Sequence, residues 1–128
     1  MGAQAITQAV RWSCARCEVS VGRIDGEPAR LPDTWTRSEA DGLTYCLSCR
    51  RARAGEAAVD SSPESSSPED RARQRRQAVI AFEIARSPTA PNRAIAGACR
   101  TTALAVAAVR TAMAEHRSTA DSAVHSDA

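Results

Sequence analysis

The stretch NRAIAGACRTTALAVAAVR, residues 92–110, decides how the C-terminal half of the chain folds. Small and apolar side chains recur at helical spacing on both sides of the tripeptide RTT, which interrupts the pattern. The first helix is expected to start near Asn92 and to end near Cys99. The second is expected to follow Thr102, whose hydroxyl can cap its first turn, and to end near His116.

A longer helix is expected upstream, in EDRARQRRQAVIAFEIAR at residues 69–86. Ser67 can cap this helix, and Pro68 suits its first position. The prolines of SPTAP, residues 87–91, end it because neither can continue a helix. Its arginines occupy the exposed first turns, and its apolar face consists of Val79, Ile80, Phe82 and Ile84.

The spacing of residues 75–115 resembles the helix-turn-helix motif of many actinobacterial and phage regulators, with NRAIA and VAAVR as the matching pieces. The resemblance implies that Ala96 lets the last two helices cross closely. Arg100 replaces the turn glycine and would have to adopt a left-handed conformation, and Thr101 replaces an apolar residue. The seam between the two helices would be filled by Ile95, Cys99, Val106 and Val109.

The resemblance also implies DNA binding by the start of the last helix, at Thr102, Ala103, Leu104, Ala107 and Ala108. Alanine cannot hydrogen-bond to a base edge, and Leu104 offers only contact with a thymine methyl group. Base readout is therefore expected to be weak and to fall on Thr101, Thr102, Arg100 and Arg110. Phosphate contacts are expected from Arg71, Arg73, Arg75, Arg76, Arg93, Arg100 and Arg110.

Charge is distributed unevenly along the chain. Residues 71–117 carry nine arginines against Glu83 and Glu115, whereas residues 54–70 carry five carboxylates and no base. The basic stretch favours duplex DNA as a partner, and a solvated face on a three-helix unit is the alternative interpretation.

Four of the five cysteines form two CxxC pairs, in WSCARC and YCLSCRR. Two residues between thiolates let both sulfurs of a pair bind one ion, and two pairs complete a tetrahedral set that suits zinc. One structural Zn²⁺ is therefore expected on Cys14, Cys17, Cys46 and Cys49. An iron–sulfur cluster and a redox dithiol are the alternatives. The fifth cysteine, Cys99, is expected to act as a small buried apolar residue.

The segment between the pairs predicts a short hairpin in which Gly42 closes the turn, and RRARAGEAA after the second pair predicts a helix. This order resembles a treble-clef or zinc-ribbon finger over residues 10–58. The glycine often found after a CxxC knuckle is Glu18 in one pair and Arg50 in the other. A miniature core is expected from Trp12, Trp35 and Tyr45, and Arg16, Arg50 and Arg51 are expected to donate toward the sulfurs or to stay in solvent.

The fold class expected is mainly α with a small zinc-bound β-hairpin. The finger at 10–58 would be followed by a disordered acidic Ser/Pro linker at 59–68, because that composition cannot bury enough apolar surface to order itself. A three-helix helix-turn-helix domain at 69–117 and a disordered tail at 118–128 complete the expected organisation.

Several classes of protein are disfavoured. No apolar run approaches 18 residues, and MGAQAITQAV is too short and too polar for a signal peptide, so a cytoplasmic protein with no membrane partner is expected, in the bacterial cytosol or nucleoid or from a phage acting in the host cytosol. The only histidines are His116 and His125, and no nucleophile–base pair or phosphate loop occurs, so an enzyme is not expected.

The leading hypothesis is a small DNA-binding transcription regulator, expected to self-associate because such readers commonly bind paired half-sites. The second hypothesis is an adaptor that binds a protein partner, in the transcription machinery for example. It would use the finger and the smooth face of the last helix, formed by Ala103, Leu104, Ala107, Ala108, Ala112 and Met113.

Overall fold

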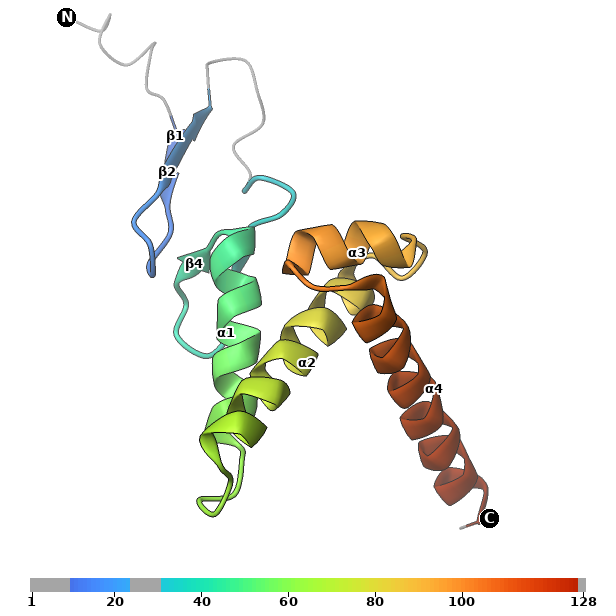
Figure 1. The fold of residues 1–128 in the computed structure, drawn as a ribbon. Helices are drawn as coiled ribbons and strands as arrows, with labels where there is room; N and C mark the ends of the chain where they lie inside the picture. Colours follow the sequence, from blue (N-terminus) through green and yellow to red (C-terminus); the bar gives the residue numbers. More distant parts are fainter. Residues whose placement is uncertain (1–9, 24–30, 127–128) are drawn as a thin grey trace, which may run out of the picture. The chain divides into compact units, whose positions relative to one another are not determined.

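The structure, a computed structural model, describes residues 10–23 and 31–126 of the 128-residue chain (Figure 1). Internal contacts divide the chain into two compact units, Met1–Arg50 and Arg51–Ala128. The division lies earlier than the boundary expected at 59–68, because the chain from Arg51 onward packs with the helices that follow it. The N-terminal stretch considered as a possible signal peptide lies, up to residue 9, outside the described residues.

The first unit contains two small antiparallel hairpins. Strand β1 (Val10–Ser13) pairs with β2 (Ser20–Arg23), and β3 (Thr36–Arg37) pairs with β4 (Thr44–Tyr45). A hydrogen bond joins the two hairpins: the hydroxyl of Thr44 donates to the carbonyl of Ser13 at 2.9 Å. Only the second hairpin was expected from the sequence.

The turn of the second hairpin closes at Gly42, as the sequence predicted. Gly42 has a φ of +72°, a left-handed conformation that glycine adopts without a steric penalty. Its amide donates to the carbonyl of Ser38 at 2.8 Å, and the amide of Ser38 donates to the carbonyl of Leu43 at 2.8 Å.

Helix α1 (Leu47–Asp60) and helix α2 (Pro68–Arg86) approach closely within the second unit. A Cβ atom at Gly55 would lie 2.7 Å from Cγ of Arg75 and 3.1 Å from Cγ2 of Val79, so a side chain here would force both neighbours to shift. A buried ion pair also joins the two helices: Arg51 donates to Glu83, whose exposed fraction is 1%.

The connection between α1 and α2 differs from the expected disordered linker. The hydroxyl of Ser62 donates to the carbonyl of Ala58 at 2.9 Å and also hydrogen-bonds to the side chain of Gln74 on α2. Ser67 caps α2, accepting from the amide of Asp70 at 3.1 Å, which confirms the predicted cap. The segment has few apolar residues that could order it by burial. Hydrogen bonds from serine hydroxyls order it instead.

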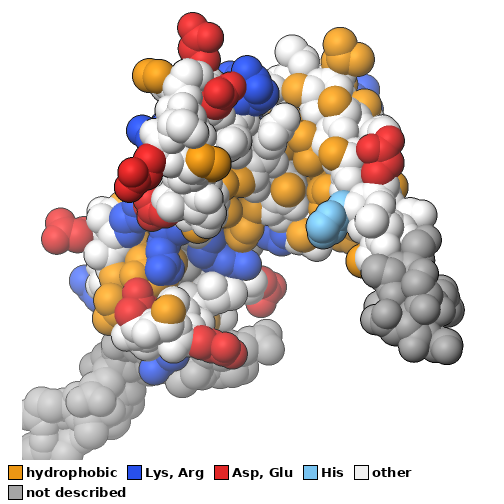
Figure 2. All heavy atoms as spheres, turned by 90° about the horizontal axis from the view of Figure 1, so that it is seen from below, with side chains coloured by type: hydrophobic (Ala, Val, Ile, Leu, Met, Phe, Trp, Pro, Cys, Tyr) orange, Lys and Arg blue, Asp and Glu red, His pale blue; other side chains and the backbone are white. Residues whose placement is uncertain are grey.

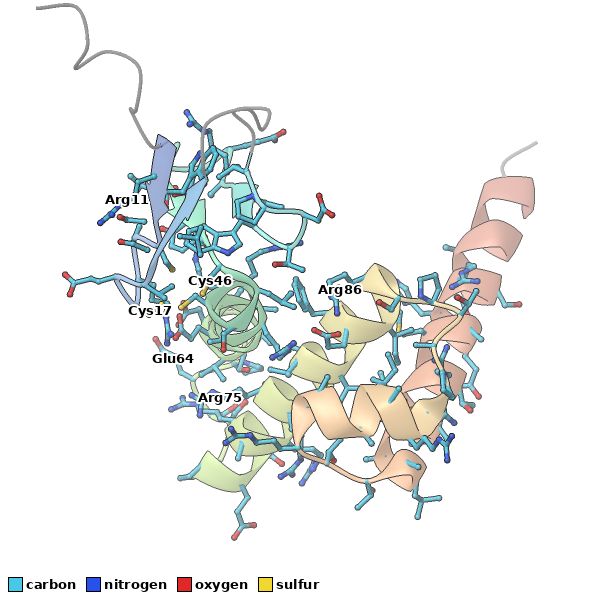
Figure 3. The ribbon with its side chains drawn as sticks, turned by 90° about the horizontal axis from the view of Figure 1, so that it is seen from above. Arg11, Cys17, Cys46, Glu64, Arg75 and Arg86 are labelled. Carbon is cyan, nitrogen blue, oxygen red and sulfur yellow. The ribbon has the colours of Figure 1, made fainter. Side chains whose placement is uncertain are left out.

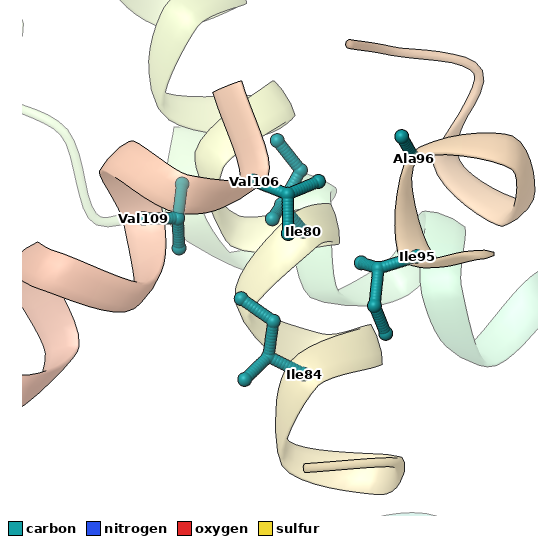
Figure 4. Packing of buried hydrophobic residues seen from close by; sticks show 6 residues of the cluster. All are labelled: Ile80, Ile84, Ile95, Ala96, Val106 and Val109. Atoms are coloured by element: carbon teal, nitrogen blue, oxygen red, sulfur yellow. The ribbon is translucent and has the colours of Figure 1, made fainter. Parts of the chain in front are cut away.

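Helices α2, α3 (Asn92–Cys99) and α4 (Ala103–Ser126) enclose the core of the second unit. Helix α3 lies across one end of α2 and α4, which diverge from it (Figure 1). Six buried side chains from the three helices point toward one another (Figure 4): Ile80, Ile84, Ile95, Ala96, Val106 and Val109. Val79 and Phe82, expected on the same apolar face, are half-buried.

Helix α4 continues to Ser126, beyond the end expected near His116 and through most of the expected disordered tail. No glycine or proline follows His116 to stop it, and Thr119 donates its hydroxyl to the carbonyl of Glu115 at 3.0 Å within the helix. Among the described residues, no helix is long and apolar enough to span a membrane.

Candidate functional site

Four cysteines come together in the first unit. Cys14 and Cys17 lie on the turn between β1 and β2, and Cys46 and Cys49 lie just before and inside the first turn of α1. Figure 3 shows Cys17 and Cys46 close together beside the start of α1. All four sulfurs lie within 4.8 Å of one another, and three of the four residues are buried, Cys17 being exposed. This cluster could hold a metal ion.

The spacing of the sulfurs fits a tetrahedral ion. A metal at about 2.3 Å from each of four sulfurs places neighbouring sulfurs about 3.8 Å apart. The Sγ atoms of Cys17 and Cys46 are 3.7 Å apart. The amide of Cys46 also donates to Sγ of Cys14 at 3.5 Å, an interaction that favours the thiolate form of Cys14.

The thiols differ in acidity. Burial raises the pKa of Cys14, but hydrogen bonds from the amides of Cys17, Cys46 and Arg16 outweigh it and lower the pKa to about 6. Burial raises the pKa of Cys49 to about 12, against the hydrogen bond from Arg16, and hydrogen bonds with the other three thiols add to the rise. A metal ion bound to the four sulfurs would favour the thiolate form of all four cysteines.

The first knuckle has the backbone shape that a glycine usually provides. Glu18 has a φ of 65°, in the left-handed region, and its amide donates to the carbonyl of Cys14 at 2.9 Å. The departure noted in the sequence is thus accommodated by strain at a non-glycine residue. Arg50, which follows the second pair, lies inside α1 and has no such strain.

The three arginines near the cysteines take different partners. Arg16 donates to Sγ of Cys49 at 3.7 Å, as expected. Arg50 donates to the carbonyl of Thr34. Arg51 takes a carboxylate as its partner instead of a sulfur or solvent. Its Nε and Nη2 donate to Glu83 at 2.9 and 2.7 Å. The expectation for Arg51 was wrong because the carboxylate that pairs with it is distant in sequence.

The expected miniature core surrounds the cysteines. Trp35 and Tyr45 are buried with them, and Trp12 packs against the cluster while half-buried. The hydroxyl of Tyr45 donates to Asp41 at 2.6 Å, so its polar end is satisfied.

The connection between α3 and α4 has the predicted left-handed residue. Arg100 has φ 56° and ψ 49°, and the amide of Thr101 donates to the carbonyl of Ala96 at 2.9 Å. Thr102 caps α4, because its hydroxyl oxygen accepts from the amide of Ala105 at 3.1 Å.

The expected seam residues lie between α3 and α4. Ile95, Val106 and Val109 are buried, and Cys99 is half-buried with its thiol directed to the carbonyl of Val79 at 3.8 Å. Burial and the negative charge of Glu83 raise the pKa of Cys99 despite the positive charge of Arg51. Cys99 is therefore a poor nucleophile that behaves as a packing residue.

The surface around the start of α4 is open. Thr102, Ala103 and Ala108 are exposed, and Leu104 is 82% exposed, a high value for a large apolar side chain. Arg93 in the first turn of α3 and Arg100 directly after its last residue are exposed, whereas Thr101 and Ala107 are half-buried. We call the set Arg93, Arg100, Thr101, Thr102 and Leu104 the α3–α4 corner.

Arg110 does not belong to this surface. Its Nε donates to Oδ1 of Asn92 at 2.7 Å, and its Nη atoms donate to the carbonyls of Pro88 and Ala90 at 3.0 and 2.6 Å. The guanidinium thus holds the loop before α3 against α4. The expectation that Arg110 reads bases conflicts with this use of its donors.

The remaining arginines of the expected DNA set lie in the first turns of α2. Arg71 donates to the carbonyl of Glu64 at 3.2 Å, and Arg73 pairs with Asp70 at 3.2 Å. Arg75 and Arg76 are exposed (Figure 3 labels Arg75). These four residues are at the end of α2 opposite to α3, so the structure does not gather them at the α3–α4 corner.

Sequence reasoning missed the buried carboxylate of Glu83. It accepts from Arg51 through Oε1 and from Arg86 through Oε2, the latter at 3.0 Å. Burial raises the pKa of Glu83, but the hydrogen bonds and charges of Arg86 and Arg51 outweigh burial and lower it. A signal was present, because Glu83 interrupts the apolar run VIAFEIA on the face that packs.

Comparisons of the chain with protein-family models, with curated proteins and with solved structures find no match.

Proposed function

We propose that the protein binds duplex DNA through the α3–α4 corner and acts as a small transcription regulator in the cytoplasm. The observation that carries this proposal is the division of the first turns of α4 into two faces. Val106 and Val109 are buried against the core, while Thr102 and Leu104 are exposed, as are Arg93 and Arg100 at the two ends of α3. A helix held from behind with its first turn open suits insertion into a major groove.

The electrostatics of the corner support a polyanionic partner. Residues 87–114 contain no carboxylate, so nothing in this stretch opposes the charge of Arg93 and Arg100. The amides in the first turn of α4 add the partial positive charge of a helix N-terminus. Phosphate binding at the corner would be sensitive to salt and largely independent of base sequence.

Base readout at the corner is proposed to be weak. Thr102 uses its hydroxyl oxygen as a helix cap, and Arg110 uses its donors within the protein. Leu104 offers only an apolar contact to a thymine methyl group. Arg100 and Thr101 are then the remaining hydrogen-bonding side chains for base edges, and a dimer on paired half-sites would add to their limited specificity.

We propose that the four clustered cysteines hold one structural zinc ion, as in a treble-clef or zinc-ribbon finger. Zinc is favoured because it accepts four thiolates in a tetrahedron without a redox change. Four protein ligands leave no open coordination position, so the ion would stabilise the first unit and would not activate water.

The test measures affinity for short duplexes by fluorescence anisotropy over a range of salt, using zinc-loaded protein. The double variant Arg93→Ala/Arg100→Ala is expected to weaken binding to all duplexes at least tenfold and to reduce the salt slope by about two. The matched control is Arg11→Ala/Arg37→Ala, which removes two exposed arginines from the first unit. If the two double variants bind duplex DNA with equal affinity, the α3–α4 corner is not the DNA-binding surface. Selection from a pool of random duplexes then shows whether any motif is enriched.

A second candidate function is an adaptor that docks a protein partner. The 82% exposure of Leu104 favours it, because a large exposed apolar side chain often marks a contact site. Leu104→Glu discriminates between the two functions. It should abolish docking of a protein partner and leave phosphate-driven DNA affinity reduced only a few-fold.

A further inference from the structure

A large apolar groove lies in the second unit, and none of the five residues of the α3–α4 corner lines it. It occupies about 1050 Å³ between α2 and α4, and Ala58, Ser61, Ser62 and Pro63 from the end of α1 and the turn after it also line it. Its apolar lining includes Ile80 and Ala81 on α2 and Val109, Ala112 and Met113 on α4. Figure 2 shows hydrophobic side chains along both walls, with a histidine on one side of the hollow.

The dimensions of the groove fit a helix. Its wall on α4 runs from Ala105 to Ala120, about 22 Å at 1.5 Å per residue, which matches about four helical turns. Half of the residues that line this wall are alanines, with Val109 and Met113 the larger apolar members, so a helix backbone can approach it closely. Apolar anchors at i, i+3, i+4 and i+7 of an incoming helix would fill the hollow.

The rim of the groove is positively charged. Arg73 and Arg76 on α2 and Arg117 on α4 line it, and among the described lining residues there is no carboxylate. Within the described part of the chain, Arg76 takes part in no ion pair, and Arg73 makes only an exposed pair with Asp70. A second copy seated through the same face would place like charges together, whereas acidic side chains beside an apolar stripe would complement the rim.

We propose that this groove binds an acidic amphipathic helix of a partner protein. The partner's apolar stripe packs on Val109, Met113 and Ile80, and its flanking carboxylates pair with Arg76 and Arg117. This function is separate from DNA binding at the α3–α4 corner, because Leu104 does not line the groove and Met113 lies on the opposite side of α4 from Leu104. The structure thereby divides the smooth helix face that the sequence suggested into two surfaces.

The probe is a fluorescent helical peptide of about 16 residues with leucines at i, i+3, i+4 and i+7 and glutamates beside them. Saturable binding by the full chain, weakened by salt, is expected. A peptide with lysines in place of the glutamates should bind at least tenfold more weakly, because it opposes the arginine rim. Equal binding of the two peptides, or no saturable binding of the acidic one, would overturn the proposal.

The protein variants locate the site. Ala112→Glu puts a carboxylate on the groove wall and should weaken the acidic peptide at least tenfold, whereas Ala114→Glu places the same charge on the exposed opposite side of α4 and should change affinity less than twofold. Thermal unfolding checks that both variants fold. If Ala112→Glu is unfolded, Arg117→Glu takes its place and should reverse the preference between the two peptides.

The outcomes separate this proposal from the proposed function. Ala112→Glu and Ala114→Glu should bind duplex DNA with equal affinity, because neither changes the α3–α4 corner. Loss of peptide binding in Ala112→Glu alone can therefore be judged separately from DNA binding. Sedimentation that finds a dimer lost only in Ala112→Glu would assign the groove to a second copy. Displacement of the peptide by duplex DNA would assign it to nucleic acid. Either result overturns an acidic helix as the occupant.

Discussion

Arg51 and Glu83 are 32 residues apart in sequence, and Arg51 donates two hydrogen bonds to one carboxylate oxygen of Glu83, at 2.9 and 2.7 Å. Arg86 donates to the other oxygen at 3.0 Å. The carboxylate is almost completely buried, whereas the two arginine side chains are 20% and 33% exposed. The pairing fixes α1 on α2 and satisfies a charge that would otherwise be costly to bury.

We expect Glu83→Gln to lower the free energy of unfolding by roughly 1–3 kcal/mol, because two arginines lose their charged acceptor. The pKa of Glu83 is lowered in the folded state, so the unfolded chain binds its proton first as pH falls. Its contribution is complete above the unfolded pKa of about 4.3 and is lost as pH falls through the folded value. Urea unfolding between pH 7 and pH 3 measures this.

Glu115→Gln is the control for Glu83→Gln, because Glu115 is exposed on α4. It should leave stability nearly unchanged at neutral pH. Below about pH 4.3 the native protein should lose stability more steeply than Glu83→Gln, which lacks the carboxylate. If Glu83→Gln and Glu115→Gln lose stability at the same rate as the native protein, the pairing of Glu83 does not contribute as described.

Arg110→Lys should destabilise the second unit by about 1–2 kcal/mol. A lysine cannot reproduce the fork that reaches Asn92, Pro88 and Ala90 together. Urea unfolding followed by circular dichroism measures the change, with the exposed Arg117→Lys as control. At temperatures where the variant is fully folded, its DNA affinity should equal that of the native protein. A selective loss of affinity for one duplex sequence would restore Arg110 as a base reader.

Local sequence signals predicted much of the structure. The caps at Ser67 and Thr102, the left-handed Arg100 and the Gly42 turn all depend on neighbours within a few residues. The cysteine cluster was also predictable, because CxxC spacing is a local geometric requirement that two pairs satisfy together.

The features that were missed depend on partners distant in sequence or on the absence of a signal. Arg51 meets Glu83 only when α1 packs on α2, and Arg110 meets the loop before α3 only when α4 is in place. The β1–β2 hairpin could not be predicted from a turn glycine, because Glu18 adopts the left-handed conformation there. The full length of α4 follows from the lack of a stop signal after His116.

Arg100→Gly should have opposite effects on stability and binding. Glycine adopts the observed φ of 56° without the penalty of a Cβ atom, so the free energy of unfolding should rise by about 1 kcal/mol. The same change removes one exposed cation from the α3–α4 corner, so DNA affinity should fall and the salt slope should decrease by about one. Thermal unfolding and anisotropy measure the two effects.

Arg100→Asn separates them further, because asparagine tolerates the left-handed region better than arginine and also lacks the charge. An affinity unchanged in both variants would remove Arg100 from the DNA surface.

Removal of the proposed zinc ion should unfold the first unit and leave the helices of the second. Both tryptophans, Trp12 and Trp35, pack in the cysteine cluster, so their fluorescence reports on the first unit alone. The core of Ile80, Val106 and their neighbours contains no cysteine ligand, so circular dichroism at 222 nm reports mainly on the second unit.

A chelator added to zinc-loaded protein should therefore shift tryptophan emission to the red while most of the helical signal persists. Binding free energy of a structural ion is folding free energy, and here it should be confined to the residues that the ion organises. Cys49→Ser is expected to behave as the chelated protein does, whereas Cys99→Ser should keep the native emission and bind the proposed single zinc ion per chain. Loss of both signals together would mean that the two units do not fold independently, and retention of both would mean that the cysteines carry no ion that matters to the fold.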